Sequence, residues 1–371
     1  MQRTRVVILG AGVAGAAAAY GLARRGIHDV CILERDPFPG QHASGRNASL
    51  IRRNLKTETD CRLALEAADW FRRPPRDFPA EVGWRTTGSL FTYRMPELPQ
   101  VEQDLERQRR AGLPFERIAP REAVRLQPLL SPEAFDEAQW TPDDGCIEIV
   151  ELLRGFLTFA VERGAQLRCG TAAQRLLVEG DRCVGVQTEA GPIRAEWVMN
   201  AAGAWANGLV AGAAESLPMT PCRRTMLVTE DVRADSTKPF TWDDGLGFYF
   251  RPDHGALLWS PCDEVPSESC DESVDPAWVE RARARARRLI PSAAGLRLEY
   301  QWGCLRTLSI DREMFVGPDP TLPGLFWVAG LGGHGVTHSP RIADLVGDLF
   351  LEGTSRVVEP RLVAPRRSAA P

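Results

Sequence analysis

The chain has 371 residues, enough for two domains around a large hydrophobic core. Its hydrophobic content of 44% and charged content of 25% are those of an ordinary globular protein, and its net charge of -4 argues against nucleic acid as a partner. Nine cysteines without C-x-x-C spacing exclude a disulfide framework and a zinc-type metal site, and they favour a reducing, cytoplasmic environment. No apolar run has transmembrane length, and no signal peptide is expected ahead of the first strand.

The first predicted unit is a strand, a glycine turn, a helix and a second strand. Residues 6–9 and 30–33 are short apolar runs typical of buried parallel strands, and residues 13–25 predict the helix between them. The turn carries three glycines in the spacing G-x-G-x-x-G, namely Gly10, Gly12 and Gly15. They permit a tight turn, the approach of a pyrophosphate, and close packing of the helix on the strand.

Further residues of this unit complete a predicted dinucleotide site. Val13 and Ala14 open the helix, whose free amides and positive dipole end face the phosphates. Glu34 closes the second strand, where an acid accepts ribose hydroxyls, and Arg35 follows it. Strand, turn, helix, strand and acid in one register favour a cofactor site over a plain βαβ turn.

The remaining elements alternate less regularly. Helices are predicted at residues 62–73, 101–111, 148–163, 276–289 and 340–351. Strands are predicted at residues 83–94, 166–168, 173–179, 183–188, 197–200, 221–229, 247–250 and 325–328, and a glycine turn at residues 330–335.

This order predicts an α/β fold with an α+β insert. A βαβ unit opens the chain and a strand–glycine–helix unit closes it, while the strands between them do not fit one parallel sheet. We therefore expect a discontinuous Rossmann-like domain of residues 1–82, 140–217 and 304–360. A mostly antiparallel substrate domain of residues 83–139 and 218–303 is inserted into it. Residues 361–371 are rich in Pro, Ala and Arg and are expected to be a disordered tail.

Five motifs in order resemble those of the FAD-dependent amine oxidoreductases. They are the opening glycine motif and the segments 44–46, 200–205, 303–307 and 330–335. This family includes D-amino acid oxidase, glycine oxidase, sarcosine oxidase and the bacterial D-amino acid (D-arginine) dehydrogenases, which the chain resembles most. The resemblance covers residues 6–351 and implies a D-amino acid oxidase-like fold, FAD as the cofactor and a small-molecule substrate that is an amino acid or an amine.

The resemblance also implies which residues hold the FAD. The turn after residues 197–200 lacks bulky side chains, so its backbone can approach a flat ligand. The late glycine turn presents amides to the flavin, where negative charge develops on reduction. The FAD contacts implied in this way are Ser44, Arg46, Asn47, Ala48, Ala202, Gly203, Trp205, Cys304, Gly330, Gly332, Gly333, His334, Gly335, Val336 and Thr337. A cysteine at the place of Cys304 is bonded to the flavin in monomeric sarcosine oxidase, but here an unbonded cysteine is favoured.

Four residues are assigned to substrate by the same resemblance. Arg306 and Arg224 match arginines that clamp the substrate carboxylate, with Arg223 as the competitor of Arg224. Tyr249 matches a tyrosine that bonds this carboxylate, although a core aromatic is the alternative. His334 is either a flavin contact or a polar wall residue. No general base is assigned, because a hydride can pass from the Cα–H of a neutral amine.

Two departures from the family pattern leave substrate and acceptor open. Leu50, Ile51 and Leu55 replace polar or aromatic contacts, and residues 83–94 contain no acid, so a neutral, apolar or larger substrate is expected. Residues 255–259 contain no lysine to activate oxygen, which favours a dehydrogenase with another acceptor, such as a quinone, over an oxidase. Oxidation of a 2-hydroxy acid and a non-catalytic FAD-binding subunit remain the alternatives.

Overall fold

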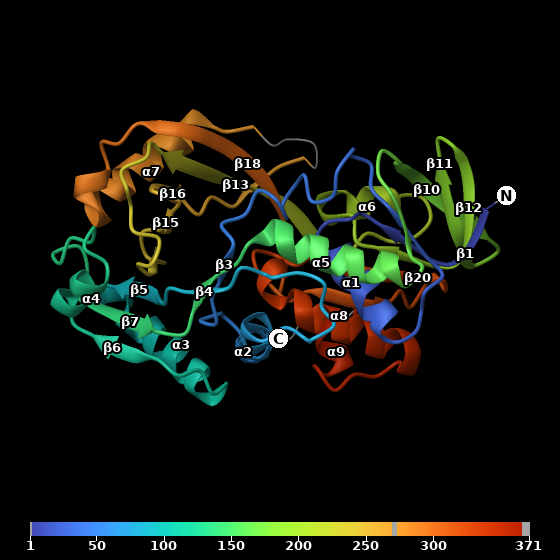
Figure 1. Cartoon of the computed structure of the whole chain (residues 1–371), viewed down its shortest axis with the longest axis horizontal. Coiled ribbons are helices and arrows are strands. Elements are labelled where there is room, and N and C mark those ends of the chain that lie inside the picture. Colours follow the sequence, from blue (N-terminus) through green and yellow to red (C-terminus); the bar gives the residue numbers. More distant parts are fainter. Residues whose placement is uncertain (1, 269–272, 366–371) are drawn as a thin grey trace.

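A computed structural model describes residues 2–268 and 273–365 as two regions side by side along the longest axis (Figure 1). The first region is built on an eight-stranded sheet. Its strands are β1 (Gln2–Leu9), β2 (Val30–Leu33), β9 (Gln166–Arg168), β10 (Ala173–Glu179), β11 (Arg182–Thr188), β12 (Gly191–Asn200), β19 (Phe315–Pro318) and β20 (Leu325–Ala329). The order is β10-β11-β12-β1-β2-β9, with β20 beside β12 and β19 beside β20. Strands β9, β2, β1, β12 and β20 are parallel, which confirms the Rossmann-like fold class.

Helices cover one face of this sheet. They are α1 (Val13–Arg24), α5 (Ile149–Glu162) and α8 (Gly335–Glu352), and α2 (Glu58–Arg72) packs against α8. Val6 and Ile8 of β1 belong to the core under these helices, while Val7 and Leu9 belong to the core of the opposite face. Small residues let α1 and α8 approach closely, because a Cβ on Gly21 would lie 1.9 Å from the carbonyl oxygen of Ala343.

A nine-stranded sheet forms the second region. Its strands are β5 (Ser89–Tyr93), β6 (Glu116–Ile118), β7 (Glu137–Thr141), β13 (Met219–Thr229), β14 (Phe240–Asp243), β15 (Phe248–Asp253), β16 (Ala256–Ser260), β17 (Val265–Pro266) and β18 (Leu298–Ser309). All of its pairings are antiparallel except that of β14 with β5. Its helices are α3 (Leu98–Arg110), α4 (Pro120–Leu126) and α7 (Pro276–Leu289). The inserted, mostly antiparallel sheet is therefore confirmed.

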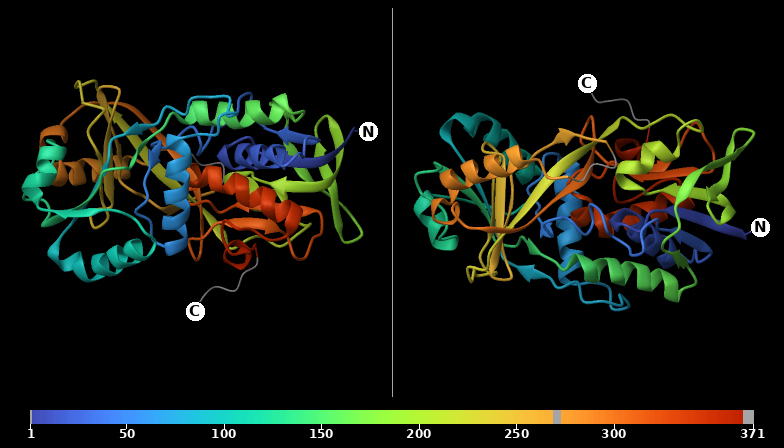
Figure 2. Two further views of the ribbon diagram at one scale, coloured as in Figure 1. Left: turned by 60° about the horizontal axis from the view of Figure 1, so that its bottom comes forward. Right: turned by 90° about the horizontal axis from the view of Figure 1, so that it is seen from above.

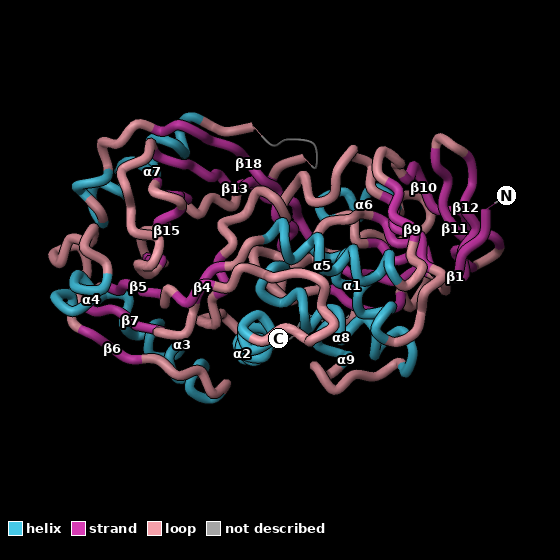
Figure 3. The backbone as a smooth tube through the Cα atoms, viewed as in Figure 1, coloured by secondary structure: helices cyan, strands magenta, loops and turns pink. Residues whose placement is uncertain are grey.

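The two regions are joined by strands and by a small third sheet. The long pair β13–β18 extends from the second sheet toward the first (Figure 2). The third sheet contains β3 (Leu50–Ile51), β8 (Gly145–Cys146) and β4 (Arg85–Thr86), short strands within long loops (Figure 3). Strands β7 and β18 run across the boundaries expected at residues 139/140 and 303/304, so the division into domains stays a prediction.

Two local expectations about element bounds were wrong. The strand expected at residues 83–94 is split into β4 and β5, because Gly88 has φ +71° and donates its N–H to the Asp144 carbonyl at 2.9 Å. Helix α8 begins at Gly335, and Pro340 lies inside it. The Ser339 hydroxyl donates to the Val336 carbonyl at 2.9 Å, which replaces the bond that Pro340 cannot make.

The tail expected from residue 361 begins with an ordered segment. Helix α9 (Pro360–Val363) is formed, and Val363 is fully buried in the core under the helices. The expected disorder is therefore wrong for residues 361–365, and residues 366–371 lie outside the described residues. Within the described ranges, no helix has the length and apolar character needed to cross a bilayer.

Candidate active site

The glycine turn after β1 has the geometry that its spacing predicts. Gly10 has φ +96° and donates its N–H to the Leu33 carbonyl at 2.8 Å. A Cβ on Gly15 would lie 1.9 Å from the Gly10 carbonyl oxygen, so only glycine lets α1 start this close to the strand. The buried Glu34 carboxylate accepts the N–H groups of Ala11 at 2.9 Å and Asp36 at 3.0 Å, which fixes it beside the turn.

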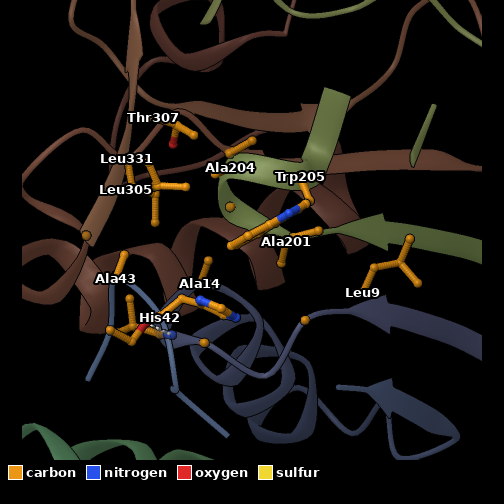
Figure 4. A pocket seen from close by; sticks show the side chains of 18 of the residues that line it. Leu9, Ala14, His42, Ala43, Ala201, Ala204, Trp205, Leu305, Thr307 and Leu331 are labelled. Atoms are coloured by element: carbon orange, nitrogen blue, oxygen red, sulfur yellow. Dashed lines mark hydrogen bonds between the residues drawn. The ribbon is translucent and has the colours of Figure 1, made fainter. Parts of the chain in front are cut away.

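A cavity of about 390 Å³ opens at this turn (Figure 4). Its side chains come from the β1 turn, from the segment after β12 and from β18, as Ala14, Trp205 and Leu305 illustrate. The expected site residues that line it are Gly10, Gly12, Val13, Ala14, Glu34, Arg35, Ser44, Asn47, Ala202, Gly203, Trp205, Arg306, Gly330, Gly332, Gly333, Gly335 and Val336. The structure thus brings together segments that lie more than 300 positions apart in the chain.

Six expected cofactor residues do not line this cavity: Gly15, Arg46, Ala48, Cys304, His334 and Thr337. Three of them contact neighbouring segments instead. Arg46 donates from Nη1 to the Gly303 carbonyl at 3.3 Å, and Thr337 donates to the Leu50 carbonyl at 3.4 Å. Ala48 packs with Tyr249 in an apolar cluster of the second region. Their assignment to FAD remains a prediction.

The end of the cavity near Trp205 contains one residue that sequence reasoning missed, His42. The Arg35 guanidinium lies 3.7 Å from the centroid of the Trp205 ring, and the His42 ring centroid lies 4.6 Å from it. A Cβ on Gly203 would have no neighbour within 4 Å, so this backbone faces open space. A glycine turn, a fixed acid and a flat aromatic wall fit a dinucleotide such as FAD. His42 adjoins the Ser44 motif in sequence, but only its contact with Trp205 reveals its place.

Cys304 lies beside this cavity but not on its wall. The side chain is 1% exposed, and burial raises the pKa of its thiol. A buried, protonated thiol is a poor nucleophile toward a flavin ring.

We therefore expect the FAD to be bound without a covalent link to Cys304. Acid precipitation of the purified protein should leave the yellow colour in the supernatant. A Cys304→Ser variant should retain the same amount of extractable flavin, since the thiol takes no part in holding it. Colour that stays in the wild-type pellet and moves to the supernatant in Cys304→Ser would contradict this.

The register of β13 and β18 places the two expected carboxylate ligands together. Arg224 pairs with Cys304 and Cys222 pairs with Arg306, so both arginines occupy the same face of the pair. Arg223 occupies the opposite face, where its Nη2 lies 3.8 Å from the Asp275 carboxylate. Strand register thus puts Arg224, and not Arg223, on the face of Arg306, which no local pattern shows.

Arg224 is held by an acid but keeps unused donors. Its side chain is 4% exposed, and its Nη2 lies 3.1 Å from Glu264 Oε1. Burial alone would raise the pKa of Glu264, but a hydrogen bond from Arg312 and the charge of Arg224 hold it below its ordinary value. Arg224 Nε and Nη1 are buried with no hydrogen-bond partner among the described residues. These donors can serve a substrate carboxylate.

Tyr249 belongs to an aromatic wall next to these arginines. It is 1% exposed, stacks on Trp242 with a centroid distance of 4.3 Å, and its hydroxyl lies 3.2 Å from Met226 Sδ. Met226 is on the same face of β13 as Arg224. The Tyr249 ring is thus part of the core. Its hydroxyl lies next to the face of β13 that carries Arg224.

Arg52 is a residue of this site that sequence reasoning missed. It follows β3, its guanidinium lies 4.1 Å from the Trp242 ring centroid, and its Nη2 lies 3.3 Å from His334 Nε2. Because arginine only donates, His334 Nε2 accepts and the imidazole proton belongs on Nδ1. Burial and the Arg52 charge lower the pKa of His334 well below its ordinary value, so its ring is neutral. The only sequence signal was an arginine after two apolar residues.

A buried acid–histidine pair lies behind His334, between α2 and α8. His338 Nδ1 lies 3.7 Å from Asp60 Oδ1, and the rings of His334 and His338 have centroids 5.8 Å apart. Burial raises the pKa of the Asp60 carboxyl to about 6 and lowers the pKa of the His338 imidazole to about 4.

These two shifts predict opposite pH dependence in two variants. The Asp60 contribution to stability is complete below its unfolded pKa and is lost as the pH rises to about 6, whereas the His338 contribution is lost as the pH falls to about 4. His338→Gln should therefore lose stability relative to wild type as the pH rises from 4 to 6, and Asp60→Asn should gain it. Each change should be on the order of 2 kcal/mol, measured by urea unfolding at fixed FAD. Slopes of the same sign would contradict the two assignments.

A dinucleotide cavity closed on one side by an arginine-bearing antiparallel sheet defines a flavin-dependent oxidoreductase. A family model described as FAD dependent oxidoreductase matches residues 5–349, and the chain belongs to this family. Its cofactor is FAD.

Curated relatives and solved structures extend over the whole chain. The 4-methylaminobutanoate oxidase (formaldehyde-forming) of Paenarthrobacter nicotinovorans is 26% identical over 94% of this chain and 44% of its own length. The glycine oxidase of Geobacillus kaustophilus is 29% identical over 94% of this chain and 93% of its own length. The structure of L-proline dehydrogenase from P. horikoshii has a TM-score of 0.90 at 25% identity, covering 98% of this chain and 97% of that one. The chain spans less than half the length of two of the curated relatives that it matches, 44% and 40%.

Proposed function

We propose that the protein oxidises the C–N bond of an amino acid, either a D-amino acid or an N-substituted one. The observation that carries the proposal is the shared face of Arg224 and Arg306 next to the FAD cavity. Two guanidinium groups on one face match the two oxygens of an α-carboxylate. The amine and amino acid substrates in the names of the relatives support the same substrate class. FAD, when bound, accepts the hydride that leaves the Cα–H bond.

The chain itself has to hold and orient the substrate. Arg306 and the free donors of Arg224 fix the carboxylate, and the Tyr249 hydroxyl borders it. The neutral His334 is not needed as a base, because its Nε2 accepts from Arg52 and the amine can lose its proton to solvent. The imine formed at Cα then reacts with water to give a keto acid and ammonia, or a keto acid and an alkylamine when the nitrogen is substituted. If the hydride leaves the N-alkyl carbon instead, water gives an aldehyde and the free amino acid.

The proposal is tested by mixing the FAD-loaded protein anaerobically with D- and L-amino acids and N-methyl amino acids. We expect the flavin absorbance to bleach with a defined subset and ammonia, or an aldehyde, to be released. Bleaching by 2-hydroxy acids without ammonia would overturn the proposal in favour of hydroxy acid oxidation. Absence of bleaching with every compound would favour an FAD-binding subunit.

The same reduced samples identify the acceptor when air is admitted. Strand β16 carries no lysine, and its side chains at Leu257, Leu258 and Trp259 are buried. We therefore propose an acceptor other than oxygen and expect reoxidation by air to be slower than by a quinone. Rapid reoxidation with stoichiometric peroxide would overturn this part alone.

A further inference from the structure

The three arginines of the site are unequally supplied with counter-ions. Three arginines, Arg52, Arg224 and Arg306, interact electrostatically. Burial lowers the pKa of Arg52, the Asp244 carboxylate opposes this shift, and the charges of Arg306 and Arg224 add to it. Arg224 has Glu264 as its ion-pair partner. Among the residues that the structure describes, no carboxylate lies within 4.0 Å of the guanidinium of Arg52 or Arg306.

Arg52 is oriented as a ligand-binding arginine. Its guanidinium lies 4.1 Å from the Trp242 ring centroid and 5.6 Å from that of Phe91, so aromatic faces hold its plane. Its Nη2 is directed to the neutral His334, which supplies an acceptor but no charge. Asp244 offsets part of the charge of Arg52 but makes no ion pair with it within 4.0 Å. A largely buried arginine without a direct ion-pair partner gains free energy when an anionic group arrives with the ligand.

The place of Arg52 separates it from the proposed α-carboxylate clamp. Trp242 lies between the Arg52 guanidinium and the Tyr249 ring, on which it stacks at 4.3 Å. Arg224 and Arg306 are reached from the other side, on the face of β13 and β18 that also carries Met226. An amino acid with its α-carboxylate on this face would extend its side chain, or its N-substituent, along Trp242 toward Arg52.

We propose that the substrate is a dicarboxylic amino acid whose second carboxylate binds Arg52. The inference rests on the proposed function and adds the substrate class to it. It differs from the expectation of a neutral, apolar or larger substrate, which was drawn from Leu50, Ile51, Leu55 and the absence of an acid in residues 83–94. Leu55 is 2% exposed and packs with Cys61 and Ala64, away from Trp242.

The test compares matched acids and amides on the FAD-loaded protein. The reactive pairs are D- and L-glutamate with glutamine and D- and L-aspartate with asparagine, each followed by anaerobic flavin bleaching. The unreactive pair is glutarate with butyrate, each followed by the perturbation of the flavin spectrum, which gives a Kd without turnover. In wild type we expect each acid to bleach the flavin faster than its amide. We also expect glutarate to bind more tightly than butyrate.

The variants are Arg52→Gln, Arg52→Lys and, as a control, Arg154→Gln, which removes an exposed arginine of α5 paired with Glu151. Arg52→Gln should lower kcat/KM for the acid and weaken glutarate binding by roughly 10- to 100-fold, with the amide and butyrate little changed. Arg52→Lys should restore part of the loss, and Arg154→Gln should have no effect.

The outcomes separate the two proposals. If amides react as well as acids, or if Arg52→Gln weakens acids and amides equally, the second-carboxylate site is overturned while amino acid oxidation stands. If no amino acid bleaches the flavin, the proposed function is overturned. In that case Arg52-dependent binding of glutarate over butyrate would still support the anion site. Wild-type selectivity alone decides the matter if Arg52→Gln does not fold.

Discussion

Arg306→Ala is expected to lower kcat/KM for the true substrate, which corresponds to a loss of about 2–5 kcal/mol of transition-state binding. The variant should keep its FAD. Arg306 lines the FAD cavity from β18, and a Cβ on Gly333 would lie 2.6 Å from its Nη1. The guanidinium therefore lies against the late glycine turn, which we propose to border the flavin. Losing it removes both the charge that holds the carboxylate and the orientation of the reacting bond.

The measurement is the anaerobic rate of flavin reduction as a function of substrate concentration. Arg224→Ala should show a smaller loss, because Glu264 already engages one of its nitrogens. Arg154→Ala is the control for the loss of an exposed arginine. An unchanged kcat/KM in Arg306→Ala, with normal flavin content, would refute the role of this residue.

The second large effect is expected at Asp144, a fully buried acid that anchors the loop carrying Arg52. Its carboxylate lies 2.7 Å from Arg53 Nε and accepts the Ser89 hydroxyl at 2.7 Å. Arg53 is itself 2% exposed, and its Nη2 has no hydrogen-bond partner among the described residues. Asp144→Ala would leave this guanidinium buried without its counter-ion, at a cost of roughly 3–5 kcal/mol in the free energy of unfolding.

The neighbouring Asp143 provides a matched control. Its side chain is 54% exposed and lies 4.0 Å from Arg53 Nη1. Asp143→Ala should cost less than about 1 kcal/mol, because an exposed ion pair is screened by solvent. Urea unfolding at fixed FAD measures both variants, and Arg53→Met combined with Asp144→Ala should recover part of the loss. Equal effects of the two aspartates would show that burial does not set the energy of this pair.

Local patterns were sufficient for elements whose constraints lie within a few residues. The turn with Gly10 and Gly15, the helix from Pro276 to Leu289 and strand β2 follow from spacing, capping and apolar runs, so their bounds were close to those observed. Pro340 misled the prediction of α8, since a proline usually starts a helix but here Ser339 supplies a compensating hydrogen bond.

The sequence by itself determined the cofactor class, the βαβ unit and the presence of a second sheet, because glycine spacing and short-range periodicity indicate all three. Tertiary structure alone decided which side chains meet. Strand register selects Arg224 over Arg223, and packing of three distant segments brings Arg52 to Trp242 and His334. Whether a charged residue is available to bind a ligand depends on its burial and on whether an acid pairs with it. Both are properties of the folded chain.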